Sequence, residues 1–149
     1  MLTIAMEDPS AADSDALMAE LSATLARITG DSGRSSFDPD DVRGPQACFV
    51  VARDGEGQAV GCGALRPLAA GIAEVKRMYA RPGTQGVGVA ILRHLETTAA
   101  GFGYRAIWLE TRLVNVRAVA FYDKHGYRRI PNYGKYAGRP EAVCFGKKL

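Results

Sequence analysis

The chain has 149 residues, 47% of them hydrophobic and 23% charged, a balance typical of one globular domain that excludes a largely disordered chain. The net charge of +3 is spread along the chain without a run of Lys or Arg, so the composition argues against a nucleic-acid-binding protein. The three cysteines lack C-x-x-C spacing, which argues against a metal site. The chain shows no apolar run of membrane-spanning length and no secretory signal. We therefore expect one cytoplasmic domain over residues 1–149 without a membrane partner.

The N-terminal half predicts a strand, a helix and three sheet strands. Apolar residues recur every three or four positions from Leu17 to Ile28, which indicates an amphipathic helix. Gly61 and Gly63 lie inside a predicted strand and indicate that another backbone approaches it closely. The predicted elements are a strand at 2–6, a helix at 11–29, a loop at 29–45 with a helical turn near 38–42, strands at 48–53, 60–67 and 72–80, and a hairpin turn at 54–57.

The C-terminal half alternates helices with strands. Asn115 is a favourable helix N-cap, and Gly126 is typical of the glycine that follows a helix. The predicted elements are a helix from Val87 or Gly88 to Gly101, a strand at 104–111, a helix after Asn115 and two final strands at 127–130 and 142–147. The order β-α-β-β-β-α-β-α-β-β predicts a mixed α/β fold.

A glycine loop connects the strand at 72–80 to the following helix. Backbone N–H groups at a helix start have no intrahelical partners and lie at the positive end of the helix dipole, so this order is typical of an anion site. The loop lacks the Gly-Lys-Ser/Thr ending of a Walker loop. Ile91 stands where a dinucleotide fingerprint needs Gly or Ala. The pattern Gln/Arg-x-x-Gly-x-Gly/Ala is satisfied by Gln85, Gly88 and Ala90.

A second motif, N-V-R-A-V-A-F-Y-D-K-H-G-Y, runs from Asn115 to Tyr127. Together the two motifs resemble the GNAT superfamily of acyl-CoA-dependent N-acyltransferases, and the element order agrees from about Val50 to the C-terminus. The resemblance implies a single-domain mixed α/β (α+β) fold. Its central, mostly antiparallel sheet would carry helices on both faces, and its fourth and fifth strands would splay apart.

The resemblance also implies that acetyl-CoA is the cosubstrate and assigns residues to it. The loop amides of the family bind the CoA pyrophosphate, and they correspond to Gln85, Gly86, Val87, Gly88, Val89 and Ala90. The fourth strand of the family offers backbone groups to the pantetheine arm, and they correspond to Met78, Tyr79 and Ala80. The asparagine of the second motif, here Asn115, often contacts the cofactor.

The loop departs from the family pattern Arg-Gly-x-Gly-x-Gly because the apolar residues 90–92 arrive early. In one register Gln85 occupies the Arg position, and the apolar positions of the following helix are shifted relative to the family pattern. In the other the loop is shorter, with Gly86 and Gly88 as its last two glycines. The spacing from Pro82 to Gln85 favours the first register.

The implied reaction is direct attack of a primary amine, from a small molecule or peptide, on the thioester through a tetrahedral intermediate. The family's general acid corresponds to Tyr122, which would protonate the departing CoA thiolate. Glu74 is the candidate base, because it lies four residues before Met78 and is expected to share its face of the strand. A water chain to solvent, or a purely structural ion pair of Glu74 with Lys76 or an arginine, is the alternative.

The sequence motifs do not specify which amine is the acceptor. Tyr133 and Tyr136 either line its pocket or serve as solvent-facing anchors, and an acidic acceptor would have three arginines as candidate contacts: Arg66, Arg77 and Arg112. A catalytically silent acyl-CoA-binding module of the same fold is the alternative function. Relatives in this superfamily are commonly homodimers, so a homodimer is a further expectation.

Overall fold

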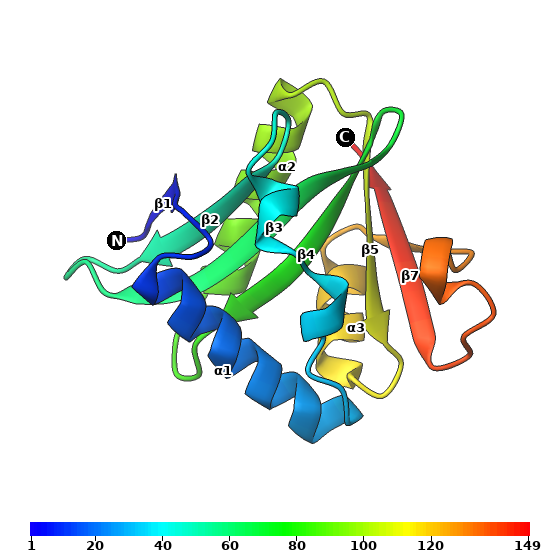
Figure 1. Ribbon diagram of the computed structural model, residues 1–149, viewed down its shortest axis with the longest axis horizontal. Helices are drawn as coiled ribbons and strands as arrows, with labels where there is room; N and C mark the ends of the chain where they lie inside the picture. Colours follow the sequence, from blue (N-terminus) through cyan, green and yellow to red (C-terminus); the bar gives the residue numbers. More distant parts are fainter.

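A seven-stranded sheet with the order β1-β2-β3-β4-β5-β7-β6 runs through the computed structural model, which describes residues 1–149 (Figure 1). All neighbouring strands are antiparallel except β4 and β5, which are parallel. The strands are β1 Thr3–Met6, β2 Cys48–Arg53, β3 Ala59–Ala69, β4 Ile72–Ala80, β5 Ala106–Arg112, β6 Arg128–Ile130 and β7 Ala142–Lys148. The mixed α/β fold and the mostly antiparallel sheet predicted above are confirmed.

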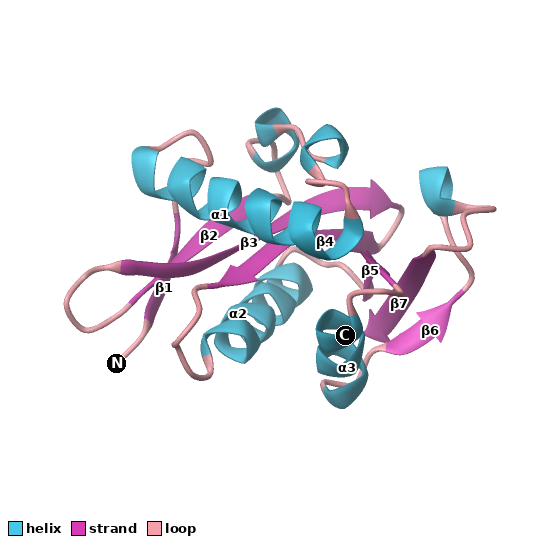
Figure 2. Ribbon diagram, turned by 90° about the horizontal axis from the view of Figure 1, so that it is seen from below, coloured by secondary structure: helices cyan, strands magenta, loops and turns pink.

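Helices cover both faces of the sheet (Figure 2). The longest helix, α1, lies on one face together with two 3₁₀ turns, and the helices α2 and α3 lie on the other. We call these the α1 face and the α2/α3 face. The helical segments are α1 Ala12–Thr29, η1 Arg34–Ser36, η2 Pro39–Val42, α2 Val87–Gly101, α3 Val116–Lys124 and η3 Gly134–Tyr136. None of the α-helices combines the length and the apolar character needed to span a bilayer.

The predicted element order is confirmed, with small shifts at element ends. Strand β3 continues to Ala69, beyond the predicted end at residue 67, because the hairpin with β4 closes only at the pair Ala69–Ile72. Strand β5 begins at Ala106 rather than at residue 104, because the Arg105 amide donates to the carbonyl of Gly71 in the preceding loop. The short turn η1 was not predicted.

The sheet separates two apolar cores, which explains the continuous hydrophobic run in β2. Val50 and Ala52 contribute to the larger core under α2 and α3, whereas Phe49 and Val51 contribute to the smaller core under α1. The larger core leaves no room on β3: a Cβ at Gly61 would lie 2.7 Å from the backbone oxygen of Tyr79. The predicted close approach to this glycine is therefore confirmed.

Strands β4 and β5 separate after a short paired segment. Their pairing covers only Ile72–Ala106, Ala73–Ile107 and Glu74–Trp108. Beyond Glu74 and Trp108 the two strands diverge, and α3 lies behind the resulting gap (Figure 1). The predicted splaying of the fourth and fifth strands is confirmed, and the gap ends at the pair Glu74–Trp108.

A bulge at Arg77 reverses the alternation of side chains along β4. Arg77 has a positive φ of 54°, and the register with β3 shifts between Cys62 and Ala64. An extra residue at a bulge sends the following side chains to the opposite face. Before the bulge Val75 belongs to the core of the α2/α3 face, and after it Met78 packs against that same core.

The bulge overturns one prediction. Glu74, the neighbour of Val75, points to the α1 face, while Met78 points to the α2/α3 face. The expectation that Glu74 and Met78 share a face is therefore wrong, because it assumed regular alternation between them.

Candidate active site

The glycine loop presents unused N–H groups at the start of α2. Gly86 is the N-cap with a φ of 72°, and the helix begins at Val87, one of the two predicted positions. The five amides from Gln85 to Val89 donate no hydrogen bond within the chain, whereas the Ala90 amide donates to the Gly86 carbonyl at 3.1 Å. Five free donors at the positive end of a 15-residue helix fit a pyrophosphate group.

The second motif packs directly against this loop. The Asn115 side chain caps α3 by accepting a hydrogen bond from the Ala118 amide at 3.3 Å. The next turn brings the Phe121 ring to 3.5 Å from the position that a Cβ on Gly88 would take. The two motifs, separated by β5 in the sequence, therefore form one surface on the α2/α3 face.

Tyr122 carries a phenol that is buried but not committed to a partner. Its ring lies 5.7 Å from that of Tyr127 and 6.1 Å from that of Phe145, and 8% of the residue is exposed. The hydroxyl makes no hydrogen bond within the chain, and burial raises the pKa of Tyr122. The phenol thus stays protonated near neutral pH and has a proton to donate.

The gap between β4 and β5 adds unpaired strand edges to these features. On one side lies the stretch of β4 after Glu74, which includes Met78, Tyr79 and Ala80, and on the other lies β5 after Trp108. Backbone groups on such edges can bind an extended molecule in the manner of an added strand. The pantetheine arm of CoA has this extended shape and carries amide groups, so the gap fits it.

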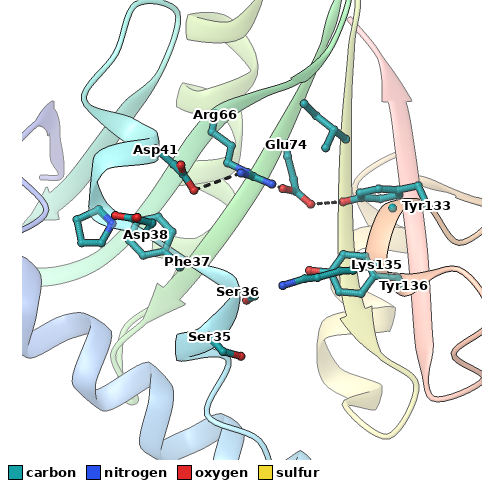
Figure 3. Close-up of a pocket in the computed structure, with 13 residues that line it drawn as sticks. Ser35, Ser36, Phe37, Asp38, Asp41, Arg66, Glu74, Tyr133, Lys135 and Tyr136 are labelled. Atoms are coloured by element: carbon teal, nitrogen blue, oxygen red, sulfur yellow. Dashed lines mark hydrogen bonds and ion pairs between the residues drawn. The ribbon is translucent and has the colours of Figure 1, made fainter.

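A cavity of about 600 Å³ opens on the α1 face (Figure 3). Its walls come from the segment of η1 and η2, from β3 and β4, and from the loop between β6 and β7. Aromatic and charged side chains line it, among them Phe37, Asp41, Arg66, Glu74, Tyr133 and Lys135. Because Glu74 also stands at the closed end of the strand gap, the cavity and the gap meet at this residue.

A row of polar side chains crosses the cavity floor (Figure 3). Arg66 donates through Nη1 to Asp41 at 3.2 Å and through Nε to Glu74 at 2.8 Å. The Tyr133 hydroxyl donates to the other oxygen of Glu74. Burial, and secondly the Glu74 carboxylate, raise the pKa of Tyr133. The row holds Glu74 in one orientation, because both of its oxygens have donors.

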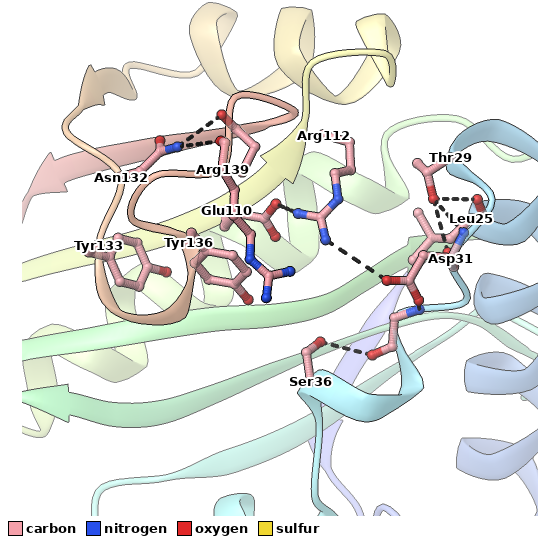
Figure 4. A network of polar contacts seen from close by, with 12 residues as sticks. Leu25, Thr29, Asp31, Ser36, Glu110, Arg112, Asn132, Tyr133, Tyr136 and Arg139 are labelled. Atoms are coloured by element: carbon pink, nitrogen blue, oxygen red, sulfur yellow. Dashed lines mark hydrogen bonds and ion pairs between the residues drawn. The ribbon is translucent and has the colours of Figure 1, made fainter.

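A second set of polar contacts lies beside the cavity (Figure 4). Arg112, the last residue of β5, pairs with Glu110 and reaches Asp31 after α1 at 3.9 Å. The Asn132 side chain donates to the carbonyls of Arg139 and Ala142 at 3.0 and 3.2 Å. The Asn132 contacts join the two ends of the loop between β6 and β7, which carries the tyrosines of the cavity, and the Arg112 contacts join the end of β5 to the segment after α1.

Each of the three arginines considered for an acidic acceptor is already engaged. Arg66 and Arg112 pair with carboxylates of the chain. Arg77 lies under α1 and donates to the Met18 carbonyl at 3.0 Å, with its Nε unpartnered. Lys135 at the cavity rim forms no ion pair, and its Nζ lies 5.5 Å from the centre of the Tyr136 ring. Tyr133 and Tyr136 both line the cavity.

Sequence reasoning missed the roles of Asp41 and Phe37 in the cavity wall. No local pattern could have revealed them, because their partners lie on other elements: the Arg66–Asp41 bond spans 25 positions of the chain. Among the His, Cys, Asp and Glu side chains, no group of three or more is arranged to hold a metal ion.

Comparison with known proteins finds similarity over nearly the whole chain. Residues 14–127 match the family described as the Acetyltransferase (GNAT) family. A protein of Azospirillum brasilense named IAA acetyltransferase is 31% identical over 99% of this chain and 98% of its own length. The crystal structure of an acyl-CoA N-acyltransferase from Klebsiella pneumoniae is 30% identical, with a TM-score of 0.84 over 100% of this chain and 98% of that one.

A third similarity concerns the fold alone. The crystal structure of a GNAT family acetyltransferase from Elizabethkingia anophelis, solved with acetyl-CoA bound, has a TM-score of 0.71 and 16% identity. The alignment covers 99% of this chain and 98% of that one.

Proposed function

We propose that this protein acetylates a primary amine of a small molecule or peptide that enters the cavity on the α1 face. The chain belongs to the Acetyltransferase (GNAT) family and is an acyl-CoA-dependent acyltransferase with acetyl-CoA as cosubstrate. The main support for this proposal is that the space for the cofactor and the space for the acceptor meet at Glu74. The gap between β4 and β5 and the cavity on the α1 face both end at Glu74.

The two substrates approach from opposite faces of the sheet. On the α2/α3 face, the free amides from Gln85 to Val89 bind the pyrophosphate, and the β4 edge from Met78 to Ala80 receives the pantetheine arm. Asn115 supports this site by fixing the start of α3, and Ala90 does so by closing the first turn of α2. The thioester then lies in the gap, within reach of an amine from the α1 face.

The side chains at the gap supply acid and base. Tyr122 protonates the CoA sulfur as it leaves, since its phenol is protonated and has no competing partner. Glu74 is the final acceptor of the proton that the amine must lose before attack. An N–H group on the unpaired part of β4 stabilises the negative charge that develops on the thioester oxygen.

Thiol release from acetyl-CoA tests the proposal. The purified chain is mixed with acetyl-CoA and separately with ethylamine, tyramine, L-phenylalanine, L-lysine, spermidine and a lysine-containing peptide. The relative named IAA acetyltransferase adds IAA to this panel. We expect thiol release above background with at least one amine and an acetylated product of matching mass. Stabilisation by acetyl-CoA in a thermal shift assay, without release for any amine, would instead support the silent binding module.

A further inference from the structure

The carboxylate of Glu74 is closed to direct contact with an acceptor. The residue is only 1% exposed, and each of its oxygens already has a donor. Arg66 donates to Oε1 at 2.8 Å, and the Nζ of Lys76 lies 3.7 Å from the same oxygen. An incoming amine therefore reaches this carboxylate only through one of its partners.

Among these partners, only Tyr133 can accept a hydrogen bond. Arginine and lysine are donors without acceptor capacity, whereas a phenolic oxygen donates one hydrogen bond and still accepts. Tyr133 gives its single proton to Glu74 and lines the cavity, so its oxygen remains available as an acceptor. Its ring lies 5.3 Å from that of Trp108, which faces Glu74 at the last rung before the gap.

The buried surroundings of this pair favour removal of a proton from an ammonium group. Arg66 and Lys76 face Asp41 and Glu74, and Lys135 and Asp38 also line the cavity, so the positive and negative charges are equal in number. Burial in this pocket, rather than a net charge, favours the neutral form of an incoming amine. Burial lowers the pKa of Lys76 for the related reason that a buried ammonium is poorly solvated.

From this geometry we infer that Tyr133 is a further catalytic residue, which takes the proton of the acceptor ammonium on its phenolic oxygen while its own proton passes to Glu74. The inference rests on the proposed function. One N–H bond of the ammonium breaks as an O–H bond forms on Tyr133, and the original O–H bond breaks as one forms on Glu74. One proton has then moved from nitrogen to carboxylate, Tyr133 ends as a phenol, and no electrons are transferred.

The route needs no free phenolate at any stage. Burial and the Glu74 carboxylate raise the pKa of Tyr133, so a phenolate that acts as an independent base would be unfavourable. In the inferred step the phenol gains and loses a proton together, and its charge stays close to neutral. Arg66, held between Asp41 and Glu74, acts as a positioning residue for the carboxylate that receives the proton.

The test compares pH profiles of kcat/KM for the wild-type chain and Tyr133→Phe, with the amine from the panel that gives the highest kcat/KM. We expect the wild type to reach a plateau near neutral pH. Tyr133→Phe should lose about ten-fold or more at pH 7, and its profile should rise tenfold per pH unit up to the pKa of the amine itself, because only amine that is already neutral reacts. Acetyl-CoA affinity, measured by calorimetry, should stay within about two-fold, since the substitution is on the opposite face of the sheet.

Tyr136→Phe is the matched control. It removes a hydroxyl from the same loop and cavity, but that hydroxyl contacts Lys76 at 3.3 Å rather than Glu74. Its profile should keep the wild-type shape whatever happens to KM. Glu74→Gln should reproduce the profile of Tyr133→Phe, and the double variant should lose little more, because the two residues act as one unit.

Three results would overturn the inference. A wild-type profile shape in Tyr133→Phe refutes the relay while leaving the acetyltransferase assignment intact. The same change of shape in Tyr136→Phe shows that the loop, not the phenol on Glu74, sets the profile. No thiol release with any amine of the panel removes the proposed function itself, and the inference with it.

Discussion

Replacing Gly61 by alanine tests whether α2, and with it the glycine loop, is held in place by close packing on β3. An added Cβ would lie 2.7 Å from the Tyr79 carbonyl oxygen, 2.7 Å from a methyl group of Val87 and 2.9 Å from one of Ile91. The carbonyl belongs to the sheet backbone, and Val87 is the first residue of α2. The carbonyl cannot move without shifting β4, and the Val87 side chain is buried in the core, where little space is free for another position.

The cost follows from these contacts. Overpacking of this kind destabilises a protein by about 1–3 kcal/mol. Alanine also restricts the unfolded chain more than glycine does, which stabilises the folded state by about 0.5 kcal/mol. A net loss of about 0.5–2.5 kcal/mol corresponds to a fall in Tm of about 1–10 °C for a chain of this length. We also expect a higher apparent KM for acetyl-CoA, because the displaced Val87 adjoins the loop amides.

Gly44→Ala is the control, because its Cβ would meet no atom within 4 Å and its φ is not positive. Its Tm, measured by circular dichroism, should stay within about 2 °C of wild type. If Gly61→Ala melts at the same temperature as Gly44→Ala, the packing of α2 on β3 is not as tight as described.

The remaining predictions concern the acid, the loop and acid stability. Tyr122→Phe should lower kcat by about ten-fold or more in the thiol-release assay, with acetyl-CoA affinity unchanged, and wild-type turnover would refute its role as acid. Gly88→Ala should leave Tm equal or slightly higher, since its Cβ makes only ordinary contact with Phe121, while the Kd of acetyl-CoA rises about ten-fold as the methyl group displaces the phosphate. Burial opposes ionisation of Glu96, but three side-chain hydrogen bonds outweigh it and lower the pKa of this carboxyl. Its contribution to stability is therefore present above the unfolded value of about 4.3 and is lost as the pH falls through the lower folded value. Urea midpoints of Glu96→Gln should accordingly depend less on pH below about pH 4 than those of wild type.

Most of the fold could be predicted because its signals are local. Helices depend on contacts within a few residues, and three local features mark them here: the periodicity from Leu17 to Ile28, the N-cap Asn115, and Gly126 just after the end of α3. The helices α1 and α3 begin and end close to these positions. The glycine loop is local in the same sense. Whether its amides are free depends on the start of α2, and Val87 was one of the two predicted first residues.

The candidate active site could be predicted only in part. Glu74 and Tyr122 were candidates from the sequence, but the face on which Glu74 lies relative to Met78 was not predicted correctly. One residue with a positive φ, Arg77, reverses the alternation that the prediction assumed. A bulge of this kind has no reliable sequence signal when the residue is an arginine.

The sequence by itself determined the element order, the position of the glycine loop before α2 and the family resemblance, since each depends on residues close together in the chain. Only the tertiary structure decided that Glu74 is enclosed by donors and that Tyr133 donates to it in the cavity. The reason is distance along the chain: the Tyr133–Glu74 bond spans 59 positions and the Arg66–Asp41 bond spans 25. Such pairs form only when strands and loops from separate parts of the sequence pack together.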